Sequence, residues 1–327
     1  MAVTLTVHDS QYPQRVSEQL RHGLRARRLP GKFLYDSPAQ AQRWLAYHQA
    51  YAPSRTAAAV LDLYQQAFQA ALRALASPQL HYVSLGCGGG MKDALCLTQA
   101  IRQGAPVLFT PMDASVALVL ETLLRVQPWL ADLTTAPLVV DFDSRPDLSA
   151  WLAQHETPRH RRLLGCFGML SNVDYRSFLP YIRSLMRPGD LVLLSANLSP
   201  GLYAEAVGRI LPQYDNPYAH AWYTGALTSL GLALEQMRLS VQPHLLRPDG
   251  HLWQIQAVAV IQQALQLVLD GEHVALSAGE SIDVFFSNRF TPEVMPEVLA
   301  ESGLTLLESW LWATHEEGLY LCARSSV

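Results

Sequence analysis

Residues 84–93 read SLGCGGGMKD, and this stretch decides the fold. It completes the apolar run HYVSL and precedes ALCLTQAIRQ, in which apolar residues recur at helical spacing. A glycine-rich turn between a strand and a helix gathers backbone N–H groups at the positive end of the helix dipole. Glycine also permits a left-handed turn and the close approach of a ligand. We therefore predict a ligand site here, with a purely structural turn as the alternative.

The glycines match neither of two common nucleotide motifs. A P-loop needs Lys followed by Ser or Thr, but Lys92 is followed by Asp93. A GxGxxG turn needs a third glycine where Met91 stands. The remaining common interpretation is the E/D/S-x-G-x-G turn of S-adenosylmethionine-dependent methyltransferases. That motif usually begins with an acidic residue, whereas this chain has Ser84.

Short apolar runs alternate with helical segments from residue 81 to residue 196. The clearest helical segments are 91–103, 114–126 and 174–187. Continuous apolar strands that alternate with helices predict a parallel sheet covered on both faces. Together with the S-adenosylmethionine interpretation of the glycine turn, this alternation predicts an α/β fold with a doubly wound, Rossmann-like methyltransferase sheet. The predicted strands are HYVSLG, PVLFTPMD, APLVVDFD, RLLGCFGML and DLVLLSAN.

The pattern changes near residue 200, which predicts a second, smaller α+β domain, named here the substrate domain. Residues 201–236 are helical in pattern, and strand-like segments follow from 239 to 290, including one long segment over 251–268. We also predict that Pro53 ends one helix, that Ser54 caps the next, and that Thr291 caps a helix at 292–302. The predicted parts are 1–60, a helical segment of the substrate domain; 61–200, the methyltransferase domain; 201–290, the substrate domain; and 291–327, a helix and strands returning to the large sheet.

Composition excludes several classes of function. Half of the residues are hydrophobic, 16% are charged, and 24 basic against 28 acidic residues leave a net charge of -4. This is not the basic footprint of a nucleic-acid binder. No apolar run approaches the roughly 20 residues that cross a bilayer, and the N-terminus does not resemble a signal peptide. We expect a soluble cytoplasmic protein without nucleic-acid or membrane partners, and the sequence favours a monomer.

Cysteine and histidine spacings give no support for a metal site. The four cysteines form no CxxC pair, and the eleven histidines include no HExxH or other ligand spacing. Small buried thiols are the expected role of the cysteines.

Polar residues follow three of the predicted strands. In a doubly wound sheet, ligands bind beyond the carboxyl ends of the strands. Asp113 can accept hydrogen bonds from two ribose hydroxyls, and Asp141 can accept one from an adenine amino group that packs on Phe142. Asn172 follows the next strand, where a substrate would face the methyl group. Each aspartate alone could be a helix cap, but three strand ends in register predict one ligand.

The order of short motifs resembles a known family, the ergothioneine-pathway histidine Nα-methyltransferases and their relatives, which include a fungal dimethylallyltryptophan N-methyltransferase. The resemblance runs from about residue 30 to the end of the chain. Its landmarks are KFLYD (32–36), YAPSRT (51–56), LGCGGGMKD, TPMDAS, VDFD, GMLSN (168–172), PQYDNPYAHAW, Gly279-Glu280 and SNRF (287–290).

This resemblance implies S-adenosylmethionine as the cofactor and a small molecule bearing an amine as the substrate. Asn172 matches the residue that orients the amine, Tyr214 one that holds the carboxylate, and Tyr35 one that lines the substrate pocket; these three are the expected catalytic residues. Ser287 matches a serine that recognises the far edge of the imidazole. The implied cofactor contacts are Tyr51, Gly86, Cys87, Gly88, Lys92, Asp113, Asp141 and Phe142.

One residue departs from the histidine enzymes of this family. They carry a glutamate two residues before the serine, and this chain has Phe285 there. An imidazole N–H buried without a partner costs about 1–3 kcal/mol, so an aromatic or apolar amino acid, held against Phe285 with Trp253 nearby, is the expected substrate. The alternative is a shifted register in which Glu280 or Asp283 replaces the glutamate, because strict alternation places Asp283 on the face of Phe285.

Two other functions stay open at this level. The enzyme could methylate another small metabolite, or the chain could be an inactive S-adenosylmethionine-binding partner protein. The identity of the substrate does not follow from the sequence.

Overall fold

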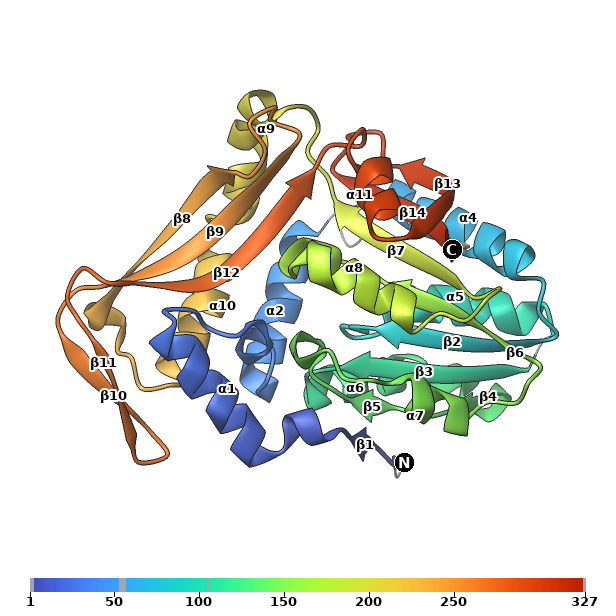
Figure 1. Cartoon of the computed structure of the whole chain (residues 1–327), viewed down its shortest axis with the longest axis horizontal. Helices are drawn as coiled ribbons and strands as arrows, with labels where there is room; N and C mark the ends of the chain where they lie inside the picture. Colours follow the sequence, from blue (N-terminus) through green and yellow to red (C-terminus); the bar gives the residue numbers. More distant parts are fainter. Residues whose placement is uncertain (1–2, 53–56, 105, 326–327) are drawn as a thin grey trace.

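The computed structural model of the chain describes residues 3–52, 57–104 and 106–325. Nine strands of this part form one sheet through the molecule, in the order β1-β5-β3-β2-β6-β7-β14-β13 with β4 beside β3 (Figure 1). The strands from β1 to β7 in this order pair in parallel. At the other edge, β14 pairs antiparallel with β7, and β13 pairs antiparallel with β14. The strands are β1 (Thr6–Val7), β2 (Gln79–Leu85), β3 (Val107–Asp113), β4 (Leu133–Thr135), β5 (Leu138–Val139), β6 (His160–Cys166), β7 (Leu191–Asn197), β13 (Leu304–Leu311) and β14 (Glu317–Arg324).

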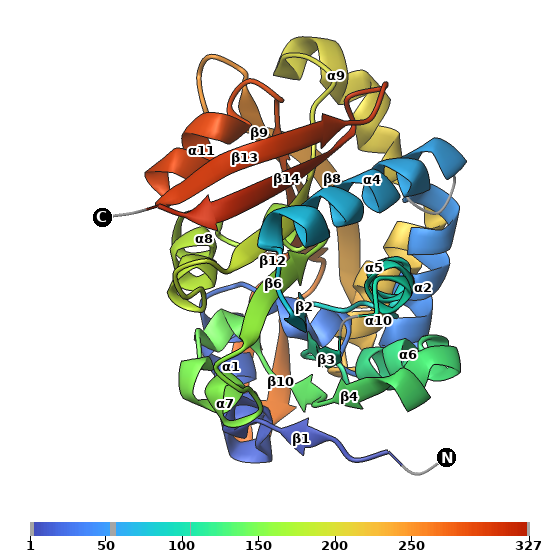
Figure 2. The ribbon, with the colours of Figure 1, turned by 90° about the vertical axis from the view of Figure 1, so that its right-hand side faces the viewer.

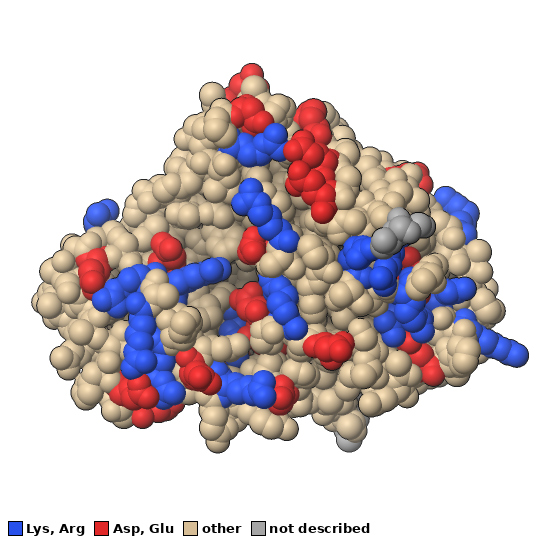
Figure 3. All heavy atoms as spheres, in the orientation of Figure 1, with Lys and Arg blue, Asp and Glu red and all other residues tan. Residues whose placement is uncertain are grey.

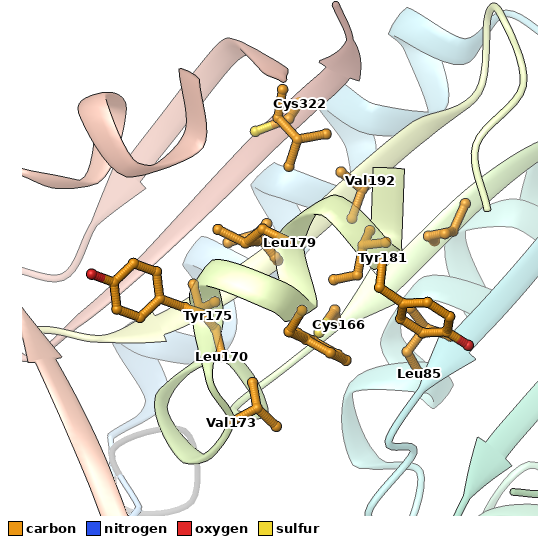
Figure 4. Packing of buried hydrophobic residues seen from close by; sticks show 14 of the residues in the cluster. Leu85, Cys166, Leu170, Val173, Tyr175, Leu179, Tyr181, Val192 and Cys322 are labelled. Atoms are coloured by element: carbon orange, nitrogen blue, oxygen red, sulfur yellow. The ribbon is translucent and has the colours of Figure 1, made fainter. Parts of the chain in front are cut away.

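Helices cover both faces of this sheet, as the unbroken apolar strands require. In Figure 2, α4, α5 and α6 lie on one side, and α7, α8 and α11 lie on the other. Figure 4 shows the second layer, where Leu179 and Tyr181 of α8 share a cluster with Cys166 of β6 and Val192 of β7. The predicted α/β sheet is therefore confirmed. The helices are α4 (Ala58–Leu75), α5 (Met91–Arg102), α6 (Val116–Arg125), α7 (Ser149–Gln154), α8 (Tyr175–Ser184) and α11 (Met295–Glu301).

A second hydrophobic core lies beyond the carboxyl ends of the parallel strands. An antiparallel sheet in the order β12-β9-β8 packs with helices from both the N-terminal segment and the region after residue 200. A hairpin of β10 and β11 extends from it (Figure 1). The helices and strands of this second region are α1 (Pro13–Arg25), α2 (Pro38–Tyr51), α9 (Tyr203–Ile210), α10 (Pro217–Thr228), β8 (Met237–Leu245), β9 (Leu252–Ile261), β10 (Leu265–Leu269), β11 (Glu272–Leu276) and β12 (Ser281–Phe290).

Three local details differ from the sequence predictions. The segment 251–268 is two strands, because the chain leaves β9 after Ile261 and β10 pairs with β11 instead. Thr291 does not cap α11; its N-cap is Val294, and the Thr291 hydroxyl bonds to Nδ1 of His251 over 2.8 Å. Thr6–Val7 pair with β5 in the large sheet, so the segment 1–60 is divided between the two cores. We propose that the chain divides into the four predicted parts, except that Thr6–Val7 belong to the large sheet.

The predicted roles of Pro53 and Ser54 lie outside the described residues. In the ranges that the structure describes, no helix has both the length and the apolar character that a membrane crossing needs.

Candidate active site

A cavity of about 550 Å³ lies between the large sheet and the second core. Basic and acidic side chains stand close together along the hollow between the two regions in Figure 3. The cavity is lined by every residue predicted for the site except Trp253 and Ser287. The predicted residues that line it are Tyr35, Tyr51, Gly86, Cys87, Gly88, Lys92, Asp113, Asp141, Phe142, Asn172, Tyr214 and Phe285.

The glycine turn between β2 and α5 is left-handed over several residues. Gly86, Gly88, Gly89 and Gly90 all have positive φ, from 53° to 91°, a backbone conformation that glycine adopts without strain. A Cβ atom on Gly86 would overlap Sδ of Met169. The turn therefore needs glycine for its conformation and, at Gly86, also for space. Its backbone lines the cavity, as a turn that holds a ligand must.

Asp113 ties this turn to the end of β3. Its Oδ2 accepts from the backbone N–H of Gly88 over 3.1 Å, and its Oδ1 accepts from Ser115 over 3.0 Å. Burial raises the pKa of Asp113 to about 6, against the opposing effect of these backbone donors. Each carboxylate oxygen has two acceptor sites, so capacity remains for hydroxyl donors of a ligand. Asp113 thus fits the two hydroxyls of a ribose.

The other end of the cavity is built partly from the N-terminal segment. Oδ2 of Asp141 accepts from Nε2 of Gln19 over 2.9 Å, and the backbone N–H of Asp141 donates to Oγ of Ser10 over 3.1 Å. Phe142 is buried and lines the cavity beside Asp141. Gln19 and Ser10 could not be assigned to the site from the sequence, because nothing near them in the chain marks them as neighbours of a residue more than 100 positions away.

A buried carboxylate stands next to Ser84, although the motif position itself is not acidic. Oδ1 of Asp93 accepts from the Tyr82 hydroxyl over 2.9 Å. Burial raises the pKa of Asp93 to about 6, and the hydroxyls of Ser84 and Tyr82 oppose that rise. Asp93 belongs to the quoted stretch, but only the first turn of α5 brings its carboxylate to the side chains of Tyr82 and Ser84.

Glu317 is a second carboxylate that the sequence analysis missed. It is buried, lines the cavity, accepts from the Tyr64 hydroxyl, and has Oε1 3.8 Å from Nζ of Lys92. Nζ of Lys92 also lies 4.7 Å from the centre of the Tyr64 ring. Glu317 reaches the site because β14 pairs with β7, a pairing that local sequence does not encode.

Asn172 and Tyr35 meet at the cavity wall that faces the second core. Oδ1 of Asn172 is buried and has no hydrogen-bond partner in the described structure. Burial raises the pKa of Tyr35, and the side chain of Asn172 opposes that rise. A buried acceptor without a donor is costly, so Oδ1 of Asn172 suits the N–H of a ligand.

Phe285 belongs to an aromatic cluster and not to a polar pocket. Its ring centre lies 5.2 Å from that of Trp222, 5.3 Å from Tyr223 and 6.1 Å from Tyr214. Trp222 in turn packs against Tyr35 at 5.4 Å. The side of the cavity at Phe285 is therefore a wall of rings.

The expectation that Asp283 shares a face with Phe285 is wrong. A bulge shifts the register of β12 between these two residues, so that Asp283 pairs with Val258 and Phe285 with Ala257. Consecutive partners on β9 point to opposite faces. Glu280 is half-buried in the turn before β12 and pairs with Arg27 over 2.9 Å. Glu280 does not line the cavity, and Asp283 lines it without sharing the strand face of Phe285, so neither carboxylate stands in the position of the family's glutamate.

Two predicted substrate residues lie behind the cavity wall. Trp253 is fully buried in the second core, where its Nε1 donates to Oγ of Ser199 over 2.9 Å. We therefore correct its predicted place in the substrate pocket. Ser287 is also fully buried, and its Oγ lies 3.0 Å from the Tyr214 hydroxyl. Ser287 thus reaches the cavity through the side chains of Tyr214 and Asn197, which line it.

Known proteins resemble this chain over most of its length. The family described as "Histidine-specific methyltransferase, SAM-dependent" matches residues 16–324. A curated relative, the histidine N-alpha-methyltransferase of Mycobacterium tuberculosis (strain CDC 1551 / Oshkosh), is 25% identical over 318 residues, covering 90% of each chain.

Solved structures with similar arrangements are more distant. A S-adenosylmethionine-dependent methyltransferase from Clostridium acetobutylicum ATCC 824 is 11% identical with a TM-score of 0.45, covering 86% of this chain and 99% of that one. The CMeT domain of the citrinin polyketide synthase is 14% identical with a TM-score of 0.48, covering 96% of this chain and 65% of that one.

Proposed function

Because the chain belongs to the family of histidine-specific, S-adenosylmethionine-dependent methyltransferases, we propose that this N-methyltransferase acts on the amine of an aromatic or otherwise apolar amino acid, in preference to histidine. One observation carries the preference. Phe285 is packed among Trp222, Tyr223 and Tyr214, and the bulge in β12 turns Asp283 to the other face of the strand. An imidazole against this wall would bury an N–H without an acceptor, and such a loss discriminates strongly in an apolar site.

The residues that we propose to bind the cofactor suit the chemical groups of S-adenosylmethionine. When bound, S-adenosylmethionine would supply a methyl group bonded to a positively charged sulfur; the amine nitrogen would gain the methyl group as the C–S bond breaks, and S-adenosylhomocysteine would be the leaving group. The glycine turn would hold the aminoacyl end together with Lys92, Asp113 would hold the ribose, and Asp141 with Phe142 would hold the adenine. Tyr51 lines the cavity from α2 and would complete that side.

At the substrate end, the chain's own groups orient the reacting amine. Oδ1 of Asn172 would accept one N–H of the neutral amine, which leaves the lone pair to point away from Asn172. Tyr214 would donate to the substrate carboxylate, and Tyr35 with Phe285 would enclose the side chain. Holding two reactants in attacking geometry is a large part of catalysis by such an enzyme.

The test is a substrate panel with labelled S-adenosylmethionine and the purified chain. It contains the twenty amino acids and the amines tryptamine, phenethylamine and histamine. We expect methyl transfer to tryptophan, tyrosine or phenylalanine at a kcat/KM at least about tenfold above histidine, because a lost hydrogen bond in an apolar site costs at least that much. Histidine as the best substrate would sink the proposal. Binding of the cofactor without turnover of any compound would instead favour the inactive partner protein.

The variant Asn172→Ala, assayed with the same panel, tests the proposed contact between Asn172 and the amine. Removing the acceptor should lower kcat/KM by about 10²-fold, since a misplaced reactant loses that much, while the affinity for S-adenosylmethionine stays the same. An equal loss of cofactor affinity would place Asn172 on the cofactor and contradict its proposed role.

A further inference from the structure

Arg289 is a buried cation in the wall of the cavity. It lies on β12, is 3% exposed, and lines the cavity beside Tyr214. One terminal nitrogen donates to the carbonyl of Leu198 over 3.1 Å, and the other donates to the Tyr214 hydroxyl. Its guanidinium carbon lies 5.1 Å from the centre of the Tyr214 ring. Arg289 is the third residue of the SNRF motif, and the sequence alone assigns it no role.

No carboxylate of the described chain neutralises this charge. None of the ion pairs within 4 Å in the described ranges involves Arg289. Its Nε is buried and has no hydrogen-bond partner there either. A buried, unpaired cation is costly to a fold. The site therefore holds a positive charge that an anionic ligand would compensate.

Hydrogen-bond counting at Tyr214 indicates where such an anion would bind. The phenol oxygen accepts from Arg289 and has Nδ2 of Asn197 as a second donor at 3.4 Å. A phenol has two acceptor sites and one proton to donate. With its acceptor sites taken, Tyr214 has its proton left for Oγ of Ser287, 3.0 Å away, or for a ligand in the cavity.

We infer that Arg289 is the positive charge that selects a substrate carboxylate, acting largely through Tyr214. The inference rests on the proposed function, because it assigns the carboxylate of that amino-acid substrate to this corner of the cavity. It predicts that the preference for an amino acid over the decarboxylated amine of the same side chain depends on Arg289. Arg289 is a positioning residue, since it acts on the ligand through the tyrosine it holds.

A purely structural role makes a different prediction. If Arg289 only held Tyr214 in place by bonding to both Tyr214 and Leu198, its removal would lower the affinities of all ligands of the cavity by the same factor. The two roles therefore separate in the ratio of affinities for an amino acid and its decarboxylated amine.

The experiment measures binding by calorimetry to the full chain saturated with S-adenosylhomocysteine. The probes are three pairs: tryptophan and tryptamine, phenylalanine and phenethylamine, and histidine and histamine. For the best-bound pair, we expect the amino acid to bind at least about tenfold more tightly than its amine, the typical effect of a hydrogen bond to a charged group. Arg289→Gln should remove most of that preference while changing the affinity for the amine by less than about threefold.

Two further variants keep the inference falsifiable if Arg289→Gln does not fold. Arg289→Lys keeps the charge and should keep part of the preference, and Tyr214→Phe removes only the hydroxyl and should lose most of it. Equal losses for amino acid and amine, or a wild-type chain without preference or without any binding, would overturn the role of Arg289. If histidine and histamine prove to be the best-bound pair, the aromatic preference fails, yet Arg289 is still tested by that pair.

Discussion

The backbone N–H of Gly88 donates to Oδ2 of Asp113 over 3.1 Å, so one side chain joins the glycine turn to the end of the neighbouring strand. Ser115 donates to the other oxygen of the same carboxylate. The two strand ends that would hold the two halves of the cofactor are thus coupled through Asp113. A change at this residue should disturb both the ribose contact and the turn.

Asp113→Asn should weaken the binding of S-adenosylmethionine. An amide in place of the carboxylate loses the charge and turns an N–H₂ group toward a backbone donor. We expect the dissociation constant to rise about 10- to 100-fold, the range for a lost hydrogen bond to a charged group. Calorimetry on the variant measures this, with Asp62→Asn on the exposed side of α4 as the control. Unchanged affinity in Asp113→Asn would remove Asp113 from the cofactor site.

The affinity for S-adenosylmethionine should depend on pH between 5 and 7. Burial raises the pKa of Asp113 to about 6 in the unliganded chain, and hydroxyl donors of a ligand favour the ionised form. Affinity should therefore be level above about pH 7 and fall by up to about tenfold per pH unit below pH 6. Titrations at pH 5, 6, 7 and 8 measure this slope, which should be shallower in Asp113→Asn. A flat profile in the wild-type chain would contradict it.

The stability of the unliganded chain should change with pH in the opposite direction. Carboxyl groups whose pKa is raised on folding contribute stability at low pH and lose it as pH rises through about 6. The melting temperature of Asp93→Asn relative to the wild type should therefore be higher at pH 8 than at pH 5.

Gly86→Ala should abolish cofactor binding through sterics as well as backbone strain. Gly86 has φ of 67°, and an added Cβ would overlap the Met169 side chain. Gly104 offers a matched control, because its φ is 74° and an added Cβ would meet no atom of the described residues within 4 Å. Gly104→Ala should cost only the backbone strain of about 1–2 kcal/mol, seen as a lower melting temperature with normal cofactor affinity. Equal effects of the two changes on that affinity would show that backbone conformation alone matters at Gly86.

Phe285→Glu should increase the affinity for histidine and lower the stability of the chain. The new carboxylate would stand on the cavity side of β12, where an imidazole N–H could meet it. Burying it among Trp222 and Tyr223 should cost about 2–5 kcal/mol of unfolding free energy. Ser281→Glu, at the exposed start of β12 and outside the cavity lining, should leave histidine affinity unchanged. Calorimetry measures the affinity of both variants for histidine. A higher affinity in both would mean that a negative charge near the cavity is enough to bind histidine, whatever its position.

Much of the fold follows from local sequence. Unbroken apolar runs such as those around Val83 and Leu193 have to be buried on both faces, and this alone predicts a parallel sheet between two helical layers. The glycines of the opening stretch require a left-handed turn, and Asp113, Asp141 and Asn172 follow strands whose carboxyl ends share one edge. Because these features depend on spacing along the chain, the sequence by itself determined the sheet, the turn and the edge on which the cavity lies.

Tertiary structure decided which groups meet in that cavity. The bulge in β12 separates Asp283 from Phe285, since one extra residue reverses the face to which every earlier side chain points. The pairing of β14 with β7 brings Glu317 to Lys92, and Gln19 reaches Asp141 from α1. Trp253, by contrast, turns into the second core. Contacts between distant segments depend on register and packing, which no local spacing encodes, and so the charge of Arg289 behind Tyr214 was visible only in the folded chain.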